Sequence, residues 1–84
     1  MAAPYFAYGA VGLTGGNTSN LDAISSSTVN QNDVAVALDN NKIYFYKLEE
    51  TSGKAENIPY VIKPDDASGD KRWELISQEV YTTN

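Results

Sequence analysis

The chain has 84 residues with no Cys and no His, and its formal net charge is −5 at pH 7. A domain of this size buries a small core and usually needs a disulfide, a metal ion or a partner chain to reinforce it. The composition excludes disulfides, thiolate and imidazole metal sites and a His-activated nucleophile, and the acidic balance argues against nucleic acid as a partner. No apolar run is long enough to span a bilayer, so we expect no membrane partner and infer association with other protein chains.

Residues 1–19 combine many apolar side chains with four glycines and one proline. Glycine and proline interrupt the segment too often for a helix, and its apolar residues are too numerous for a solvated tail. We expect an extended N-terminal docking arm over 1–19, followed by a small β domain over 20–84. Packing of this segment on its own domain is the alternative. The candidate interface residues of the arm are Tyr5, Phe6, Tyr8, Val11 and Leu13.

Residues 20–25 predict at most one short helical turn. Ser19 or Asn20 can cap it, because their side chains can accept hydrogen bonds from the first free amides of a helix. A polar connector with a run of serines at 25–27 follows this turn.

The strongest structural signal is a β-hairpin over 33–48 that turns at Asn40-Asn41. Asparagine tolerates the positive φ that a two-residue hairpin turn requires. A turn there pairs Asp39 with Lys42, and the further pairs follow by counting outward: Leu38 with Ile43, Ala37 with Tyr44, Val36 with Phe45, and Ala35 with Tyr46. Alternate pairs share a face of the sheet. We expect one face to form the core, made of Val36, Leu38, Ile43 and Phe45.

The opposite face of this hairpin sets Ala35 and Ala37 against Tyr46 and Tyr44. Small residues beside large amphipathic rings can form a flat aromatic surface of the kind that is enriched at protein interfaces. Tyr44 and Tyr46 are therefore candidate interface residues. The alternative is that the two tyrosines pack on the N-terminal segment of the same chain.

Two further strands are expected near 59–63 and 71–77. Pro59 and Pro64 bound the first strand and keep it short, because proline cannot donate to a sheet. In the last strand, Trp73 and Leu75 share one face and are expected to be core residues. The expected fold is mainly β, a small antiparallel sheet or sandwich built on the hairpin, with a polar tail after residue 77.

The loop over 65–70 holds the densest cluster of charged groups in the chain. A calcium site made of Asp65, Asp66 and Asp70 is one hypothesis, but the loop lacks the ligand order of a calcium-binding loop. The favoured interpretation is a turn, shaped by residues such as Asp65 and Gly69, in which Lys71 and Arg72 form exposed ion pairs with the aspartates. We expect no metal site, no cofactor and no catalytic residue.

Residues 21–76 carry a series of short motifs. These are LDAIS at 21–25, Asp33-Val34, Tyr44-Phe45-Tyr46 with Leu48, Ser52-Gly53 with Glu56, Pro59 with Val61-Ile62, Pro64-Asp65, and Gly69 with Lys71-Arg72-Trp73 and Leu75. The series resembles a small module that recurs in virion proteins of tailed phages and prophages, in tail-fibre and capsid-associated chains. The resemblance implies attachment to repetitive scaffolds and oligomer formation, often as trimers. The chain ends shortly after the match, which favours a small free-standing subunit over a fibre.

From this resemblance we expect a bacteriophage virion structural protein, a capsid decoration or head-associated subunit located in the virion. Its expected partners are the major capsid protein or other virion subunits and further copies of itself, with a trimer favoured. One alternative is a carbohydrate-binding module of a tail fibre or tail tip, in which Trp73 and Tyr44, Tyr46 or Tyr60 offer a ring platform. Another is a soluble regulator of the host. None of these three functions is enzymatic, so we do not expect the chain to be an enzyme.

Overall fold

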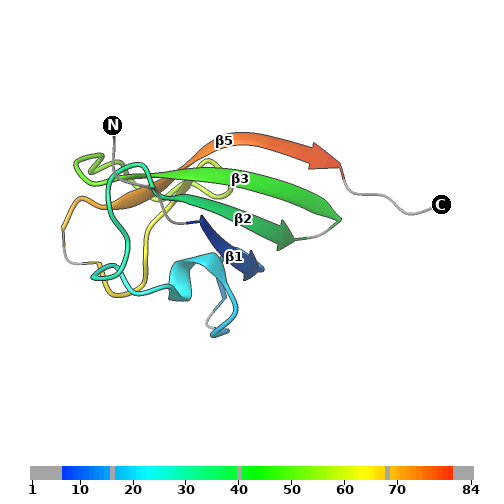
Figure 1. The fold of residues 1–84 in the computed structure, drawn as a ribbon, viewed down its shortest axis with the longest axis horizontal. Helices are drawn as coiled ribbons and strands as arrows, with labels where there is room; N and C mark the ends of the chain where they lie inside the picture. The colour runs from blue at the N-terminus through cyan, green and yellow to red at the C-terminus, as the bar shows by residue number, and fades with distance from the viewer. Residues whose placement is uncertain (1–6, 16, 40, 68, 81–84) are drawn as a thin grey trace.

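The structure is a computed structural model that describes residues 7–15, 17–39, 41–67 and 69–80. Its architecture is mainly β, as expected. Five strands form one curled sheet in the order β1-β2-β3-β5-β4, and Figure 1 shows β5, β3, β2 and β1 side by side. The elements are β1 Ala7–Val11, the 3-10 helix η1 Leu21–Ala23, β2 Val34–Asp39, β3 Lys42–Glu49, β4 Val61–Ile62 and β5 Arg72–Val80.

Strands β2 and β3 form the expected hairpin. Asp39 pairs with Lys42, and every further pair down to Ala35 with Tyr46 agrees with the count from the sequence. Asn41 has a φ of 64°, the left-handed conformation that asparagine tolerates better than most residues. The predicted register is therefore confirmed.

The N-terminal segment is part of the sheet over its described residues. Strand β1 pairs in parallel with β2 from Ala7 beside Val34 to Val11 beside Leu38, so the sheet is mixed and not purely antiparallel. The chain then turns at Gly12, whose amide donates to the Leu38 carbonyl at 2.6 Å. Gly12 has a φ of 92°, and a Cβ at this position would collide with the Asn20 side chain. The described part of residues 1–19 thus packs on its own domain.

Strand β5 pairs with β3 along its whole length and is longer than expected. The pairing shifts between Phe45 and Tyr46, so that Ile76 is an extra residue in a bulge of β5. Strand β5 continues to Val80, and the expectation of a polar tail after residue 77 is wrong for 78–80. The short strand β4 pairs with β5 at the other edge of the sheet, within the range expected from the prolines.

The hydrophobic core lies on one face of the sheet, which we call the inner face, and it contradicts the prediction for the hairpin. The fully or nearly buried residues of this face are Ala35, Ala37, Tyr44, Tyr46, Leu48, Ile62 and Trp73. Leu13, Val29 and Leu21 of η1, all from the segment between β1 and β2, are buried in the same cluster. The two alanines leave room for the large rings on β3, which stack with their centroids 6.2 Å apart. The core assignments of Trp73 and Leu75 are confirmed, since Leu75 packs against the same cluster.

The expected core of Val36, Leu38, Ile43 and Phe45 is wrong, because these residues lie on the opposite face. Val36 and Leu38 are about two-fifths exposed, and Ile43 and Phe45 are half-buried. The physical reason is the position of the loops. Within the segment 12–33, Leu13, Leu21 and Val29 pack on the inner face, where the amide of Leu21 donates to the Gly12 carbonyl and that of Asp22 to the Leu13 carbonyl.

The expected helical turn is the single turn η1. Asn20 occupies its N-cap position, but its side chain makes no capping hydrogen bond. Among the described residues, no helix is long and apolar enough to cross a bilayer.

Candidate interaction surface

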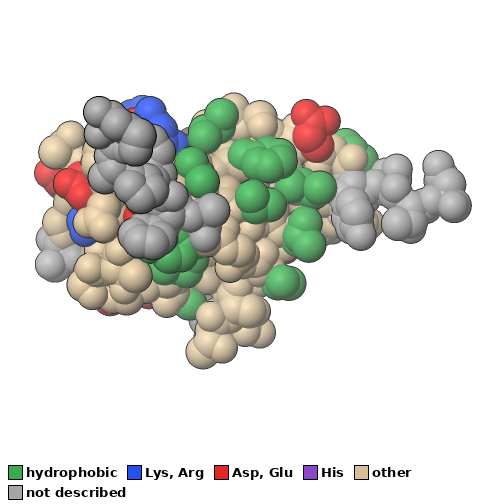
Figure 2. All heavy atoms as spheres, in the orientation of Figure 1, with side chains coloured by type: hydrophobic (Ala, Val, Ile, Leu, Met, Phe, Trp, Pro, Cys, Tyr) green, Lys and Arg blue, Asp and Glu red, His purple; other side chains and the backbone are tan. Residues whose placement is uncertain are grey.

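The face of the sheet opposite the core is exposed and apolar, and we call it the outer face. Its apolar residues come from four neighbouring strands: Val11 on β1, Val34, Val36 and Leu38 on β2, Ile43 and Phe45 on β3, and Ile76 on β5. Figure 2 shows hydrophobic side chains gathered over these strands. Val11 is 62% exposed and Ile76 is 59% exposed. Isolated apolar residues are common on surfaces, whereas a contiguous group of this kind is a candidate interaction surface.

A shallow groove of about 400 Å³ runs across the outer face. Its lining includes Val34, Val36 and Phe45 on one side and Ile76 and Ser77 on the other, and none of its lining residues is charged. Ile76, the additional residue in the bulge of β5, is among the residues that line the groove, and a bulge disrupts the regular strand pairing locally. The outer face therefore has a groove and, in its lining, the exposed side chain of Ile76.

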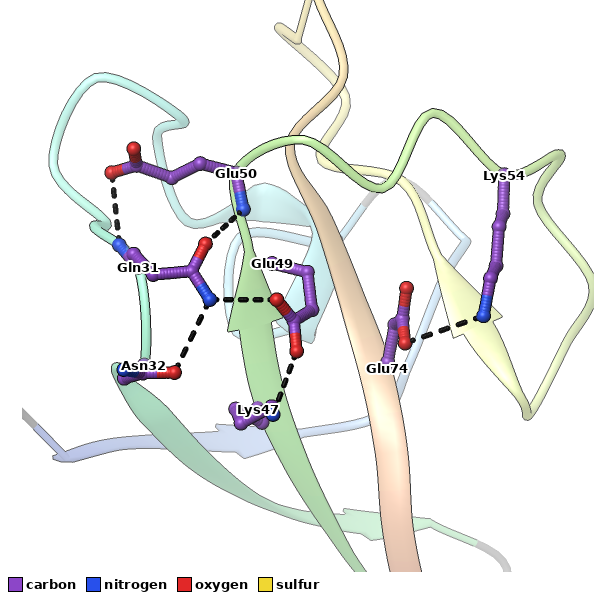
Figure 3. Close-up of polar contacts among 7 residues, drawn as sticks. All are labelled: Gln31, Asn32, Lys47, Glu49, Glu50, Lys54 and Glu74. Atoms are coloured by element: carbon purple, nitrogen blue, oxygen red, sulfur yellow. Dashed lines mark hydrogen bonds and ion pairs between the residues drawn. The ribbon is translucent and has the colours of Figure 1, made fainter.

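The outer face becomes polar toward one end, as Figure 3 shows. The Lys47 Nζ lies 2.7 Å from Glu49 Oε2, and the Lys54 Nζ lies 3.5 Å from Glu74 Oε1. The Gln31 side chain donates from Nε2 to Glu49 Oε1 at 2.6 Å and accepts from the Glu50 amide at 2.8 Å. The hydrogen bonds from Lys47 and Gln31 hold the pKa of Glu49 below its ordinary value. These contacts fasten the loop before β2 to the end of β3.

The residues that the sequence favoured as docking anchors are placed differently. Tyr46 is fully buried and Tyr44 nearly so, so the expected tyrosine surface is wrong. Tyr8 packs its ring edge-on to Trp73, with 6.1 Å between centroids, and Leu13 is buried. Tyr5 and Phe6 lie outside the described residues. Of the candidate interface residues that are described, only Val11 is exposed on the outer face.

The loop over 65–70 does not form the expected ion pairs. Lys71 Nζ donates to the carbonyls of Ser26 and Val29, and Arg72 is buried. The guanidinium donates from Nε to the Lys54 carbonyl and from Nη1 to the Gly69 carbonyl, each at 2.8 Å. Both cations are thus hydrogen-bonded to backbone carbonyls, and they join this loop to distant segments of the chain.

Two of the aspartates in this loop also make long-range contacts. Asp66 accepts from the Ser26 amide at 2.8 Å and from the Ser25 hydroxyl at 3.0 Å, which lowers its pKa. The Asp65 amide donates to the Asp22 carbonyl. The prediction treated the loop as a local turn and missed this connection to 22–26, because no sequence pattern pairs segments forty residues apart.

The carbohydrate platform expected as an alternative is not available. Trp73, Tyr44 and Tyr46 lie in the core, and of the four proposed rings only Tyr60 is exposed. The Trp73 Nε1 is also buried without a hydrogen-bond partner among the described residues. Within the same residues, no group of three or more acidic, His or Cys side chains is placed to hold a metal ion.

The parity of β3 distinguishes the two faces once its pairing with β5 is known. Leu48 shares its face with Tyr44 and Tyr46, and it pairs with Trp73, which was already assigned to the core. This relation indicates that the tyrosines point inward.

Comparison of the chain with protein-family models, with curated proteins and with solved structures finds no match in any of the three.

Proposed function

We propose that this chain is a bacteriophage virion structural protein, a capsid decoration or head-associated subunit that assembles as a homo-oligomer through its outer face. The outer face is the observation that carries the proposal. Four neighbouring strands present seven large apolar side chains there, while Tyr44 and Tyr46 of β3 are buried on the inner face. The series of motifs over residues 21–76 supports a virion location and favours a trimer.

The occupant of the outer face is a second copy of this chain. The groove is lined without charged residues, so two copies of an acidic protein can meet there without burying like charges. Ile76 lines the groove, is 59% exposed and can contact the groove of a neighbouring copy in a head-to-tail arrangement, the kind of contact that closes into a ring such as a trimer. Four strands about 4.8 Å apart and about six residues long give a footprint of roughly 400 Å², within the range of the largest patches on monomeric proteins.

The oligomer docks on a repetitive virion scaffold, with the major capsid protein as the main candidate. The sheet of this small chain has its core on the inner face, and the chain gains stability when the apolar outer face is buried as well. The interface is worth about 25 cal/mol for each square ångström of apolar surface removed from water. In a closed oligomer, the outer face of every copy is buried.

The virion location is tested by a mass-spectrometric census of particles purified from lysed cells that encode the chain. We expect the chain in washed, intact particles at a copy number comparable to that of the capsid protein. The matched fraction is the particle-free supernatant of the same lysate. Recovery of the chain in the supernatant alone would support a soluble host regulator and contradict the proposal.

A further inference from the structure

The sheet has an open edge along the second half of β5. Strand β4 pairs only with Trp73 and Glu74, and the Tyr60 carbonyl accepts a hydrogen bond from the amide of Leu75 at 3.0 Å. Among the described residues, no strand continues beyond this point on that side of β5. Residues 76–80, which we call the open edge, are all exposed. They therefore present backbone donors and acceptors to solvent along one side of the strand.

The open edge carries no lysine or proline that would block pairing with a further strand. Proteins usually protect an exposed edge with such residues or cover it with a loop. The opposite edge of the sheet is covered in this way at the end of β1. There the amide of Val11 donates to the Ser19 carbonyl at 2.9 Å, and the Ser19 hydroxyl donates to the Val11 carbonyl at 3.3 Å. Within the described residues, the chain thus closes the end of one edge and leaves the other available.

The side chains of the open edge indicate which kind of strand would fit beside it. Glu79 pairs with Ile43 and belongs to the outer face, whereas Val80 pairs with Lys42 and belongs to the other face. Glu79 is the only charged residue of the open edge, and Val80 is 70% exposed. Residues directly opposite each other on neighbouring strands share a face and interact. An added strand would therefore meet a carboxylate on one face and an aliphatic side chain on the other.

We propose that the open edge binds an extended segment of another protein by strand addition. The segment carries Lys or Arg on the face of Glu79 and aliphatic side chains on the face of Val80. In this mode of recognition, backbone hydrogen bonds provide affinity and the alternating side chains provide specificity.

A second copy of the chain fits the open edge less well than such a basic segment. Pairing of two open edges would place the Glu79 carboxylates of both copies in one short interface, and like charges across strands are unfavourable. The edge of β1 is closed at Val11 by Ser19, so it is a poor partner as well. The proposal is independent of the oligomer formed through the outer face, because it concerns the edge of the sheet.

Binding of a labelled synthetic peptide to the full chain, measured by fluorescence anisotropy, tests this proposal. The probe is fluorescein-labelled Thr-Val-Arg-Val-Arg-Val-Thr, whose alternating residues give an extended strand one basic and one aliphatic face. We expect saturable binding that protects the amides of residues 76–80 from hydrogen exchange. The same peptide with N-methyl groups on its central amides keeps every side chain but cannot donate the backbone hydrogen bonds. It should bind at least about tenfold more weakly, because several hydrogen bonds are lost together.

The variant Glu79→Lys separates recognition of the open edge from general attraction between an acidic protein and a basic peptide. It should bind the arginine peptide about fivefold more weakly and bind more tightly a peptide in which glutamate replaces arginine. Asp70→Lys makes the same change in net charge at an exposed position before β5 and should keep the wild-type preference. Absence of binding, equal binding of the N-methylated peptide, or equal effects of the two variants would overturn the proposal. So would protection of residues 76–80 without peptide that is lost on dilution, which would assign the open edge to a second copy.

Discussion

Tyr46 is fully buried, and its hydroxyl is the polar group that the core must accommodate. The hydroxyl donates to the Pro59 carbonyl at 2.7 Å, which ties β3 to the loop before β4. Burial raises the pKa of this phenol. The hydrogen bond therefore stays intact across the ordinary pH range and joins two segments that the hairpin alone does not connect.

Replacing Tyr46 with Phe removes this hydrogen bond and leaves the Pro59 carbonyl without its partner. We expect the free energy of unfolding to fall by about 1–2 kcal/mol, measured by urea denaturation. Tyr60→Phe is the matched control, since Tyr60 is 55% exposed, and it should change stability by less than about 0.5 kcal/mol. Equal stabilities of the two variants would show that the Tyr46 hydroxyl contributes nothing.

Predictions for single residues were correct where the size and polarity of one side chain determine whether it is buried. The size and strand spacing of Trp73 placed it in the core, as the structure shows. The partners of Lys71 and Arg72 could not be predicted in this way. Aspartates precede them in the sequence, but they donate to carbonyls of Ser26, Val29, Lys54 and Gly69. Only the folded loops bring these carbonyls within reach.

At the scale of elements, β1 has a structural role that the idea of a detachable arm did not anticipate. Its pairing with β2 and the burial of Leu13 directly after it make this segment part of the domain. Deleting residues 2–13 would remove an edge strand and a core side chain together. We therefore expect such a deletion to destabilise the fold, in contrast to the separable arm that the sequence favours.

A finer comparison uses two aliphatic residues near the end of β1. Leu13→Ala opens a cavity in the core and should lower the free energy of unfolding by about 2–5 kcal/mol. Val11→Ala, at a position that is 62% exposed, should cost less than about 1 kcal/mol. Both values come from urea denaturation at a chain concentration low enough to keep the protein monomeric. Similar small losses for both variants would contradict the packing of this segment on the domain.

The hairpin shows which properties of an element the sequence determines. Its register follows from a two-residue turn and from counting, and every pair agrees with the expectation. Its orientation could not be obtained in the same way, because both faces are apolar. Leu13, Leu21 and Val29 cover the Ala–Tyr face and make it the inner one. They lie in the irregular segment between β1 and β2, whose path no periodic pattern encodes.

At the scale of the whole molecule, the described residues cover one face of the sheet with core side chains and loops. The core side chains and the loops lie on the inner face, while the outer face has aliphatic side chains and a groove that lacks charged residues. The ion pairs and the Gln31 contacts lie at one end of the outer face. This distribution places an apolar centre beside a polar rim, the arrangement found in protein interfaces.

The central claim is that the outer face joins copies of this chain, and the molar mass in solution tests it most directly. Light scattering after size-exclusion chromatography should give a homo-oligomer, with a trimer favoured, for the wild type. Combining Val36→Lys with Ile76→Lys places two charges at the groove and should yield monomers, since central apolar anchors contribute about 2 kcal/mol or more each.

Val80→Lys provides the matched control for that measurement. Val80 is 70% exposed but does not line the groove, so this variant should keep the wild-type mass. Circular dichroism of all three proteins should report the same strand content. A monomeric wild type at high concentration, or a double variant that keeps the oligomeric mass, would contradict the account.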